Sequence, residues 1–353
     1  MRAMEEKIRE LLRGAIKESV FPGAVAAVSI RGDRTVVAEG NFSYDPKSQQ
    51  MSPDSIFDCA SITKSVPTSS LALLLIDKGE LSLTDKMIRY IPEYKGAFGE
   101  SILIRHLLTH TLNFDFRLSD CKTLPADEIL QTILTSDLKC PPGEQFFYAN
   151  ATSILLGMVI ERVCKAALPQ IANEYFFSPL GMSNTTFDTS VLDKSRTVPT
   201  EEDAWRGRVI QGEVHDESAW ALRPLMTAGS AGLFSTASDL LEFSEMLLCG
   251  GVYRGKLFLT PTVVQKMYTD QLPHIHNVRT GLGWELDQGY MGAKRSRCTF
   301  GKTGFTGTVI VLDRPREVSF VLLSNYTWPV RKRDRSEINR IRAQLADIVF
   351  GVL

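Results

Sequence analysis

The sequence predicts a mixed α/β chain (α+β in type) in which one antiparallel sheet, flanked by the two terminal helices, is joined to a mostly helical second lobe. Strand-like patterns occur near both ends of the 353 residues, the long middle has helical apolar spacing, and each end carries an amphipathic helix. If the first and last strands pair, a cleft lies between the sheet and the helical lobe. The predicted sheet lobe comprises 1–80 with 278–353, and the helical lobe comprises 81–277.

The N-terminal part contains a helix, a hairpin and a second helix. The charged start of the chain has apolar residues at helical spacing, namely Ile8, Leu11, Leu12 and Ile16. Strand-like runs follow at 24–30 and 35–40, and the intervening Arg31-Gly32-Asp33-Arg34 has the composition of a hairpin turn. The run 63–78 is rich in Leu and Ala and predicts a helix.

The pattern in the middle of the sequence predicts further helices, and the pattern in the C-terminal part predicts strands again. Expected helix starts lie at Ser82 or Thr84, near Ser101, at Asn150 to Ser153, and at Ser235 to Ser238, with Ser238 as an N-cap. Predicted strands cover 282–286, 309–312 and 318–324, and a final amphipathic helix covers 336–349.

The composition is that of a soluble globular protein, with 44% apolar residues and a net charge of −1. The balance of 40 basic and 41 acidic residues argues against a nucleic-acid partner, which would require a basic excess. The longest apolar run, 71–76, is far shorter than the roughly 20 residues that span a bilayer. The charged start lacks the apolar core of a signal peptide. We therefore expect a cytoplasmic protein without a membrane anchor; the oligomeric state is not encoded.

Cysteine and histidine spacing indicates neither a metal nor a cofactor. The six cysteines form no C-x-x-C pair, and Cys59 is better interpreted as a small buried residue than as a nucleophile. His106 and His110 have the i, i+4 spacing of a zinc helix but lack the glutamate of that motif. We expect a packed helix at 105–111 whose histidines make local hydrogen bonds.

Three motifs occur in one order along the chain and together supply the groups for acyl transfer through a serine ester. They are Ser61-Ile62-Thr63-Lys64, Tyr148-Ala149-Asn150 and Lys302-Thr303-Gly304. A serine hydroxyl needs a neighbour that accepts its proton, and Lys64, three residues further on, shares a helix face with Ser61. Ser-x-x-Lys also occurs at 119–122 and 136–139, so spacing alone selects nothing. The apolar stretch before Ser61 and the helical run after it distinguish this copy.

These motifs resemble those of the class C β-lactamase family, with its D-alanyl-D-alanine peptidase and carboxylesterase relatives. The resemblance covers nearly the whole chain, because other segments are also similar to recurrent family segments: 57–60, 106–111, 232–237 and Val214-His215-Asp216. It implies a β-lactamase/transpeptidase-like fold. It also implies a cofactor-independent serine hydrolase that acts on small esters, β-lactams or D-amino-acid amides.

Carried over by residue, the resemblance implies that Ser61 attacks a carbonyl and that Lys64 and Tyr148 handle its proton. Asn150 would orient Lys64 and a substrate amide. The unperturbed pKa of tyrosine is about 10, so Tyr148 can act as a base at neutral pH only if cations stabilise its phenolate. Lys64 and Lys302 are suitable cations.

The third motif would border the substrate. The resemblance places the oxyanion between the backbone N–H groups of Ser61 and Phe305, and it places Lys302, Thr303 and Gly304 along the bound substrate. The Lys302 ammonium favours a substrate that carries a carboxylate. Glycine at 304 would let a substrate approach the strand closely.

Two alternatives stay open at this point. A penicillin-binding or sensor protein would form the same acyl-enzyme and release it slowly, because acylation alone requires the same motifs. A catalytically dead relative is disfavoured because no motif residue is missing.

Four residues, Trp205, Arg206, Arg208 and Trp220, are candidates for the mouth of the cleft, although packing is the favoured role for each.

Overall fold

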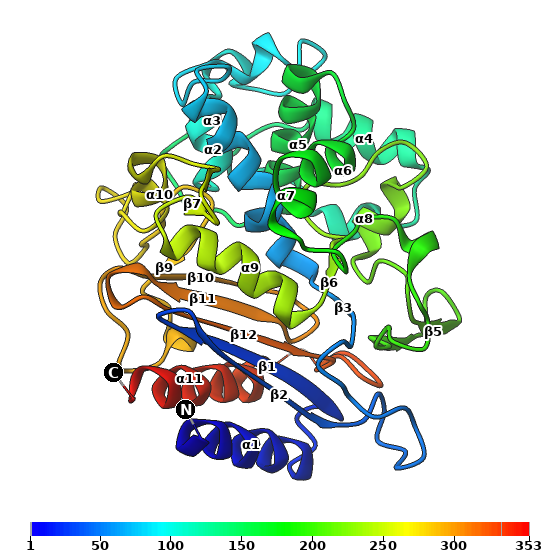
Figure 1. Cartoon of the computed structure of the whole chain (residues 1–353). Coiled ribbons are helices and arrows are strands. Elements are labelled where there is room, and N and C mark those ends of the chain that lie inside the picture. Colours follow the sequence, from blue (N-terminus) through cyan, green and yellow to red (C-terminus); the bar gives the residue numbers. More distant parts are fainter. Residues whose placement is uncertain (1, 333, 353) are drawn as a thin grey trace.

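A six-stranded antiparallel sheet is the centre of the computed structural model, which describes residues 2–332 and 334–352. Its order is β2-β1-β12-β11-β10-β9. The strands are β1 (Gly23–Ile30), β2 (Asp33–Gly40), β9 (Glu285–Leu286), β10 (Thr299–Thr303), β11 (Val309–Asp313) and β12 (Val318–Ser324). Strands β1 and β12 pair from Ala24↔Ser324 to Ile30↔Val318, so the two ends of the chain share one sheet, as predicted (Figure 1).

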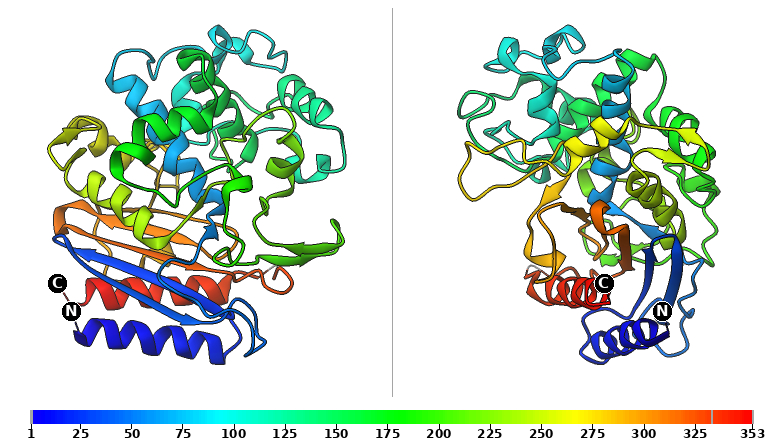
Figure 2. Two further views of the ribbon diagram at one scale, coloured as in Figure 1. Left: turned by 45° about the vertical axis from the view of Figure 1, so that its right-hand side comes forward. Right: turned by 60° about the vertical axis from the view of Figure 1, so that its left-hand side comes forward.

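The terminal helices α1 (Arg2–Lys17) and α11 (Ser336–Phe350) cover one face of this sheet, and α9 (Ala237–Leu248) lies against the other (Figures 1 and 2). Both faces are therefore buried, and β1 and β12 are buried along almost their whole length and mostly apolar on both faces instead of alternating. Successive side chains of β12 enter different cores: Phe320 packs with the terminal helices, whereas Val321 packs in the larger core with the helical part.

The middle of the chain is predominantly helical, as predicted, but it also contains short two-stranded ribbons. The further helices are α2 (Ser70–Asp77), α3 (Ile104–Leu108), α4 (Ala126–Thr135), α5 (Asn150–Cys164), α6 (Leu168–Ala172), α7 (Ser178–Leu180), α8 (Glu217–Leu222) and α10 (Pro261–Met267). The ribbons are β3 (Phe57–Asp58) with β6 (Phe234–Ser235), β4 (Glu201–Asp203) with β5 (Arg208–Ile210), and β7 (Val252–Tyr253) with β8 (Lys256–Leu257). The lobe boundaries near 80 and 278 stay a prediction.

The expectation of one continuous helix over 63–78 is wrong. A 3-10 turn at Ala60–Lys64 and a π turn at Ser65–Ser69 precede α2. Val66 leaves helical geometry, with φ −117° and ψ 106°. The cause lies in the sequence, because Pro67 disfavours the helical region for the residue before it. The break separates the turn that carries Ser61 from the buried helix α2.

Other boundaries also differ from the expectations. The N-cap of α9 is Thr236, not Ser238, and its side chain accepts a hydrogen bond from the Asp239 N–H. The start expected at Ser82 or Thr84 gives only a 3-10 turn at Met87–Arg89. The strand expected over 282–286 shortens to β9, whereas β12 has the predicted bounds. Within the described residues, no helix is both long and apolar enough to cross a membrane.

Candidate active site

Ser61 lies in the 3-10 turn that follows β3, and Lys64 lies one turn further on. The Lys64 Nζ is 3.0 Å from the Ser61 Oγ and donates to the Ser230 carbonyl at 2.7 Å. The Lys64 side chain is almost completely buried. This burial lowers the pKa of Lys64, although the nearby Tyr148 opposes the shift. A lowered pKa makes it easier for the Lys64 ammonium to lose its proton.

Tyr148 reaches the same point from the loop before α5. Its ring centroid is 4.3 Å from the Lys302 Nζ and 5.2 Å from the Lys64 Nζ. Burial by itself would raise the pKa of Tyr148, but the two lysines and a hydrogen bond from Ser61 outweigh it and lower the pKa. The tyrosine is 42% exposed, so part of it faces the solvent side of the site. The structure thus brings Ser61, Lys64, Tyr148 and Lys302 together, as the sequence predicted.

Lys302 on β10 has an acidic partner that sequence reasoning missed. Its Nζ lies 2.6 Å from Glu285 Oε1, and the other carboxylate oxygen of Glu285 accepts from the Tyr290 hydroxyl at 2.8 Å. Burial would lower the pKa of Lys302, but Glu285 and Tyr148 raise it overall. Lys302 is therefore held as an ammonium. The available signal was the strand predicted over 282–286, because its pairing with the strand that carries the third motif places Glu285 opposite Gly301.

Asn150 is the first residue of α5, and its Nδ2 donates to Asp216 Oδ2 at 2.9 Å. Asp216 is also the N-cap of α8, where Oδ1 accepts from the Ala219 N–H at 2.9 Å. Among the described residues, Lys64 bonds to Ser61 and the Ser230 carbonyl and makes no hydrogen bond to Asn150, so the orienting role of Asn150 toward Lys64 stays a prediction. The role of Asn150 toward a substrate stays a prediction.

The third motif lies along the edge of β10. Strand β9 pairs only with Phe300 and Gly301 of β10. Thr303 therefore has no strand partner on that side within the described chain, although it pairs with Val309 of β11 on the other side. A Cβ at Gly304 would lie 2.0 Å from Thr308 Oγ1 and 2.5 Å from the Cys59 carbonyl oxygen. Glycine is thus required here by close packing of the strand on the nucleophile turn. Close approach of a substrate is therefore not needed to explain why residue 304 is a glycine, and that role stays a prediction.

Phe305 follows the strand and is partly exposed. The Arg335 guanidinium carbon lies 3.9 Å from its ring centroid, and the Arg335 Nη2 donates to its carbonyl at 2.9 Å. The backbone at Phe305 is therefore fixed from the side of α11.

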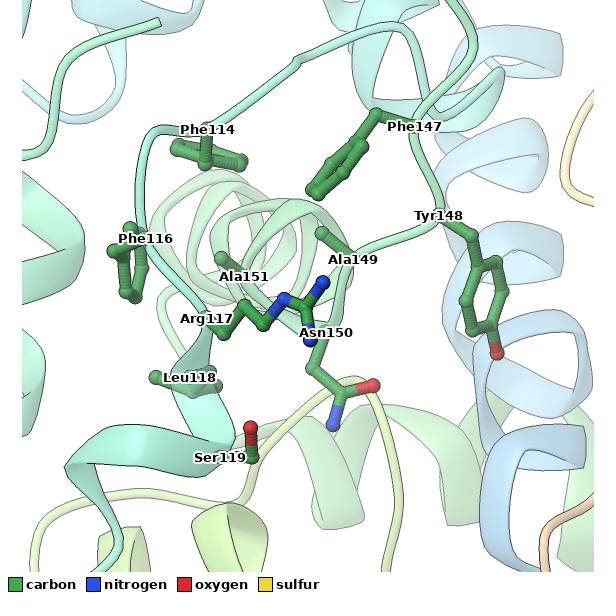
Figure 3. A pocket seen from close by; sticks show the side chains of 10 residues that line it. All are labelled: Phe114, Phe116, Arg117, Leu118, Ser119, Phe147, Tyr148, Ala149, Asn150 and Ala151. Atoms are coloured by element: carbon green, nitrogen blue, oxygen red, sulfur yellow. The ribbon is translucent and has the colours of Figure 1, made fainter. Parts of the chain in front are cut away.

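Two cavities meet at Tyr148. The first has a volume of about 380 Å³ and is mainly apolar and partly aromatic, with Phe114, Phe116, Arg117, Leu118, Ser119 and Phe147 in its lining beside residues 148–151. Figure 3 shows the Tyr148 ring pointing away from this cavity, Asn150 at its edge, and Arg117 extending across it.

The second cavity, of about 400 Å³, is more polar and cationic. Its lining includes Glu285, Tyr290, Thr303, Arg279, Arg335, Asn339 and Arg342. The buried Arg342 donates from Nη2 to the Gly304 and Thr308 carbonyls, at 2.9 and 2.8 Å. Its Nε has no hydrogen-bond partner within the described residues.

The other candidate chemistries find little support in the geometry. Burial raises the pKa of the Cys59 thiol well above its usual value, which makes it a poor nucleophile. His106 Nδ1 accepts from the Leu103 N–H at 3.1 Å, as expected. Contrary to expectation, the His110 Nδ1 has no hydrogen-bond partner among the described residues, and the centroid of its ring lies 4.9 Å from that of Tyr148. The described residues contain no group of three His, Cys, Asp or Glu side chains placed to hold a metal ion.

A family model, Beta-lactamase, matches residues 8–344. The chain belongs to the β-lactamase family. Its relatives include an Escherichia coli (strain K12) protein named "Putative D-alanyl-D-alanine carboxypeptidase", which is 28% identical over 307 residues, 76% of this chain and 69% of the relative.

Two solved structures show the same fold as this β-lactamase-family chain. The first is EstCE1, a hydrolase with promiscuous acyltransferase activity, at 24% identity, a TM-score of 0.79 and 99% coverage of both chains. The second is a penicillin-binding protein homologue from Caulobacter crescentus, at 17% identity and a TM-score of 0.77, with 99% of this chain and 98% of that chain covered. The predicted family and fold class are therefore confirmed.

Proposed function

We propose that the protein is a serine hydrolase that forms an acyl-enzyme on Ser61 and hydrolyses small carboxylic esters, β-lactams or D-amino-acid amides. The observation that carries the proposal is the 3.0 Å contact between the Lys64 Nζ and the Ser61 Oγ, beside a tyrosine that contacts two lysines. Lys64 and Lys302 have pKa values shifted in opposite directions, down and up respectively. Such a divergence suits one group to accept protons and the other to stay charged.

The reaction proceeds in two halves. The Ser61 Oγ forms a bond to the substrate carbonyl carbon while its proton passes to Lys64 or Tyr148. The bond to the leaving group then breaks, and the leaving group departs with that proton. Water attacks the resulting ester, gives its proton to the same base, and the proton returns to the Ser61 oxygen as the acid is released.

The negative charge on the carbonyl oxygen needs donors that are fixed before the reaction. The backbone N–H groups of Ser61 and Phe305 are the proposed pair, and one such donor contributes roughly 3 kcal/mol in the transition state. The short turn around Ser61 and the Arg335 contacts to Phe305 support this assignment, because both peptide groups are held in place.

The two cavities support a substrate with unlike ends. The cationic cavity offers the guanidinium groups of Arg279, Arg335 and Arg342 to a carboxylate, and burial has lowered the pKa of Arg342 to about 9. An anion beside this guanidinium would stabilise its charged form. The aromatic cavity suits an apolar acyl group. The name of the E. coli relative is consistent with a substrate that ends in a carboxylate.

The test is a substrate panel of p-nitrophenyl esters, nitrocefin and D-alanyl amides, with Ser61→Ala as the comparison. We expect the activity of the wild type to collapse by at least 10³-fold in the variant while circular dichroism stays unchanged. Persistent activity in Ser61→Ala would remove the nucleophile assignment. Intact mass after brief exposure to a β-lactam separates turnover from storage, because a long-lived adduct would indicate a penicillin-binding or sensor protein instead.

A further inference from the structure

The segment His215-Asp216 contacts residues of all three motif regions, although it belongs to none of the motifs. The His215 N–H donates to Asp58 Oδ2 at 2.7 Å, just before the nucleophile turn. The His215 ring stacks on the Phe305 ring, with centroids 5.5 Å apart. Asp216 accepts from Asn150 at 2.9 Å. One short segment therefore joins elements that are far apart in the sequence.

Asp58 holds the backbone immediately before Ser61. Its Oδ1 accepts from the Ala60 N–H at 2.7 Å. Ala60 has a φ of +46°, in the left-handed region that an alanine rarely adopts. A residue in such a conformation persists only where its surroundings fix it, and these positions cluster at functional sites. The Asp58 carboxylate thus fixes the conformation that presents Ser61.

The same stretch is bonded to the loop that carries Phe305. The Thr306 hydroxyl donates to the Asp58 carbonyl at 2.9 Å, and the Thr308 hydroxyl donates to the Cys59 carbonyl at 3.1 Å. Asp58 is therefore connected to both proposed oxyanion donors through hydrogen bonds to neighbouring residues. Its side chain bonds to Ala60, which precedes Ser61. Its carbonyl bonds to Thr306, which follows Phe305, and its side chain bonds to the backbone of His215, whose ring stacks on Phe305.

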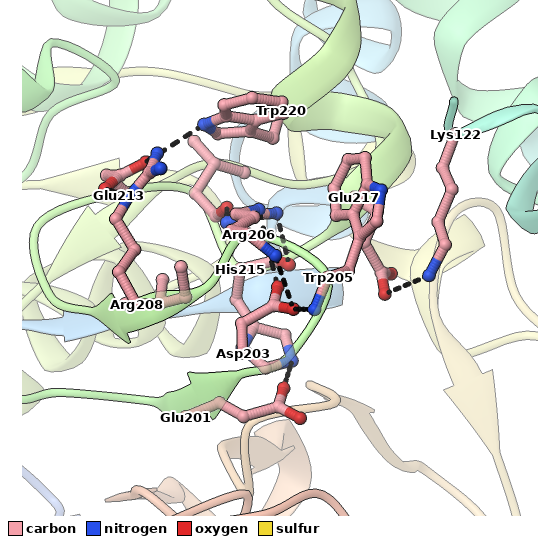
Figure 4. A network of polar contacts seen from close by, with 12 residues as sticks. Lys122, Glu201, Asp203, Trp205, Arg206, Arg208, Glu213, His215, Glu217 and Trp220 are labelled. Atoms are coloured by element: carbon pink, nitrogen blue, oxygen red, sulfur yellow. Dashed lines mark hydrogen bonds and ion pairs between the residues drawn. The ribbon is translucent and has the colours of Figure 1, made fainter. Parts of the chain in front are cut away.

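The His215 ring is 98% buried, and neither of its nitrogens has a hydrogen-bond partner in the described chain. Figure 4 shows it beneath the Trp205, Arg206 and Trp220 side chains, with Glu201 Oε2 3.5 Å from its Nε2. Burial is the main cause that lowers the pKa of His215, to about 3, so the ring is neutral at pH 7. A neutral ring without hydrogen bonds acts here as a flat support for Phe305.

We propose that Asp58 and His215 are positioning residues that hold the backbone N–H groups of Ser61 and Phe305 at one fixed separation, so that both can bind the same oxyanion. The inference rests on the proposed function and adds the means by which its two donors are aligned. Neither residue contacts the reacting atoms, so each acts through a neighbour.

The buried charge of Asp58 indicates that this carboxylate serves the site and not the stability of the fold. Burial raises the pKa of Asp58 to about 6, although the N–H groups of His215 and Ala60 oppose this shift. Because the folded pKa lies above the usual value, the contribution of Asp58 to stability is largest at low pH and is lost as the pH rises through about 6. At neutral pH the buried carboxylate therefore costs stability and yet holds the nucleophile turn.

The charged and titratable groups that face this pair come from several elements. The charges with the largest effect on Asp58 are Asp216 and Arg206. Those that face His215 are Arg331, Asp216, Arg206, Asp203 and Glu201.

The first test is Asp58→Asn, which keeps the shape and one acceptor but replaces the other acceptor with a donor that faces an N–H group. We expect kcat for an activated ester to fall by about 10²-fold with little change in KM, because misplaced catalytic groups cost about that much. The melting temperature of the variant at pH 7 should not fall in proportion to this loss of kcat. The wild-type kcat should also decline as the pH drops through about 6, and this decline should be absent from the variant.

The matched control is Asp239→Asn at a second buried carboxylate. Asp239 accepts from the Asn184 N–H at 2.7 Å and the Thr185 hydroxyl at 2.9 Å, and neither of these partners belongs to a motif. Burial also raises its pKa. We expect this variant to change stability but not the pH dependence of kcat. If the two variants behaved alike, Asp58 would have only a structural role and the proposal would be overturned.

The His215 ring is tested by comparing His215→Ala with His215→Phe. We expect a loss of at least tenfold in kcat for alanine and a substantial recovery for phenylalanine, because the aromatic ring restores the support for Phe305. A phenylalanine variant as slow as the alanine variant would contradict this role. If the wild type lacks Ser61-dependent activity, the proposed function fails; if that activity is present and Asp58→Asn retains it fully, only the positioning inference fails.

Discussion

At the scale of single residues, the site combines opposite pKa shifts in two lysines whose Nζ atoms both lie near the ring of one tyrosine. Burial lowers the pKa of Lys64, whereas Glu285 and Tyr148 raise the pKa of Lys302 against the effect of burial. A sequence shows that both lysines are present but not which one has an acidic partner. Glu285 decides this, and it reaches Lys302 only because β9 pairs with β10.

Glu285→Gln is therefore expected to release Lys302 from its raised pKa. Without the carboxylate, burial dominates and the ammonium loses its proton at a lower pH. The alkaline limb of kcat/KM for a carboxylate-bearing substrate should move to lower pH, measured from pH 6 to 10. Tyr290→Phe is the matched control, because it removes the other bond to Glu285 and leaves the ion pair. An unmoved alkaline limb in Glu285→Gln would exclude Lys302 as the group that titrates.

At the scale of elements, the sequence predicted well where local pattern determines structure. Strand β12 was predicted with its observed bounds because its residues are apolar on both faces. Predictions failed where a single residue or a distant partner decides. Pro67 interrupts the expected helix over 63–78, and the partners Ser230 and Asp216 reach Lys64 and Asn150 only through the tertiary fold. No local pattern in the sequence announces such contacts.

The cap of α9 provides a direct test at this scale. Thr236 accepts from the Asp239 N–H at 3.2 Å, whereas Ser238, the cap expected from sequence, is already inside the helix. We expect Thr236→Ala to lower the free energy of unfolding by about 1 kcal/mol. Ser238→Ala should change it by less than about 0.5 kcal/mol. Urea unfolding of both variants measures the difference, and equal losses would show that Thr236 does not act as the cap.

At the scale of the whole molecule, the sheet separates two cores, and within the described chain the smaller core meets the site only at Tyr290 and at the N-terminal part of α11. Strands β1 and β12 direct alternate side chains to the terminal helices and to the helical part. The Ser61 turn packs on the larger core through Cys59 and Ile62, whereas the second cavity is lined in part by Tyr290 and Arg342 on the side of the smaller core. Stability and catalysis should therefore be separable by substitutions in the smaller core that lie near the C-terminal end of α11, away from this cavity.

Phe320→Ala tests this separation. Phe320 is completely buried in β12 and contacts Phe350 of α11 edge to face, with centroids 6.2 Å apart. We expect a loss of about 3–5 kcal/mol in the free energy of unfolding, from lost burial and the cavity that remains. Because β11 lies between β12 and β10, kcat per folded molecule should stay within about twofold of the wild type under conditions where the variant is folded.

Val191→Ala, at a residue that is 67% exposed, is the control and should change stability by less than about 0.5 kcal/mol. A fall in kcat that parallels the loss of stability would show that the terminal helices also support the catalytic geometry, and that the two cores do not act independently.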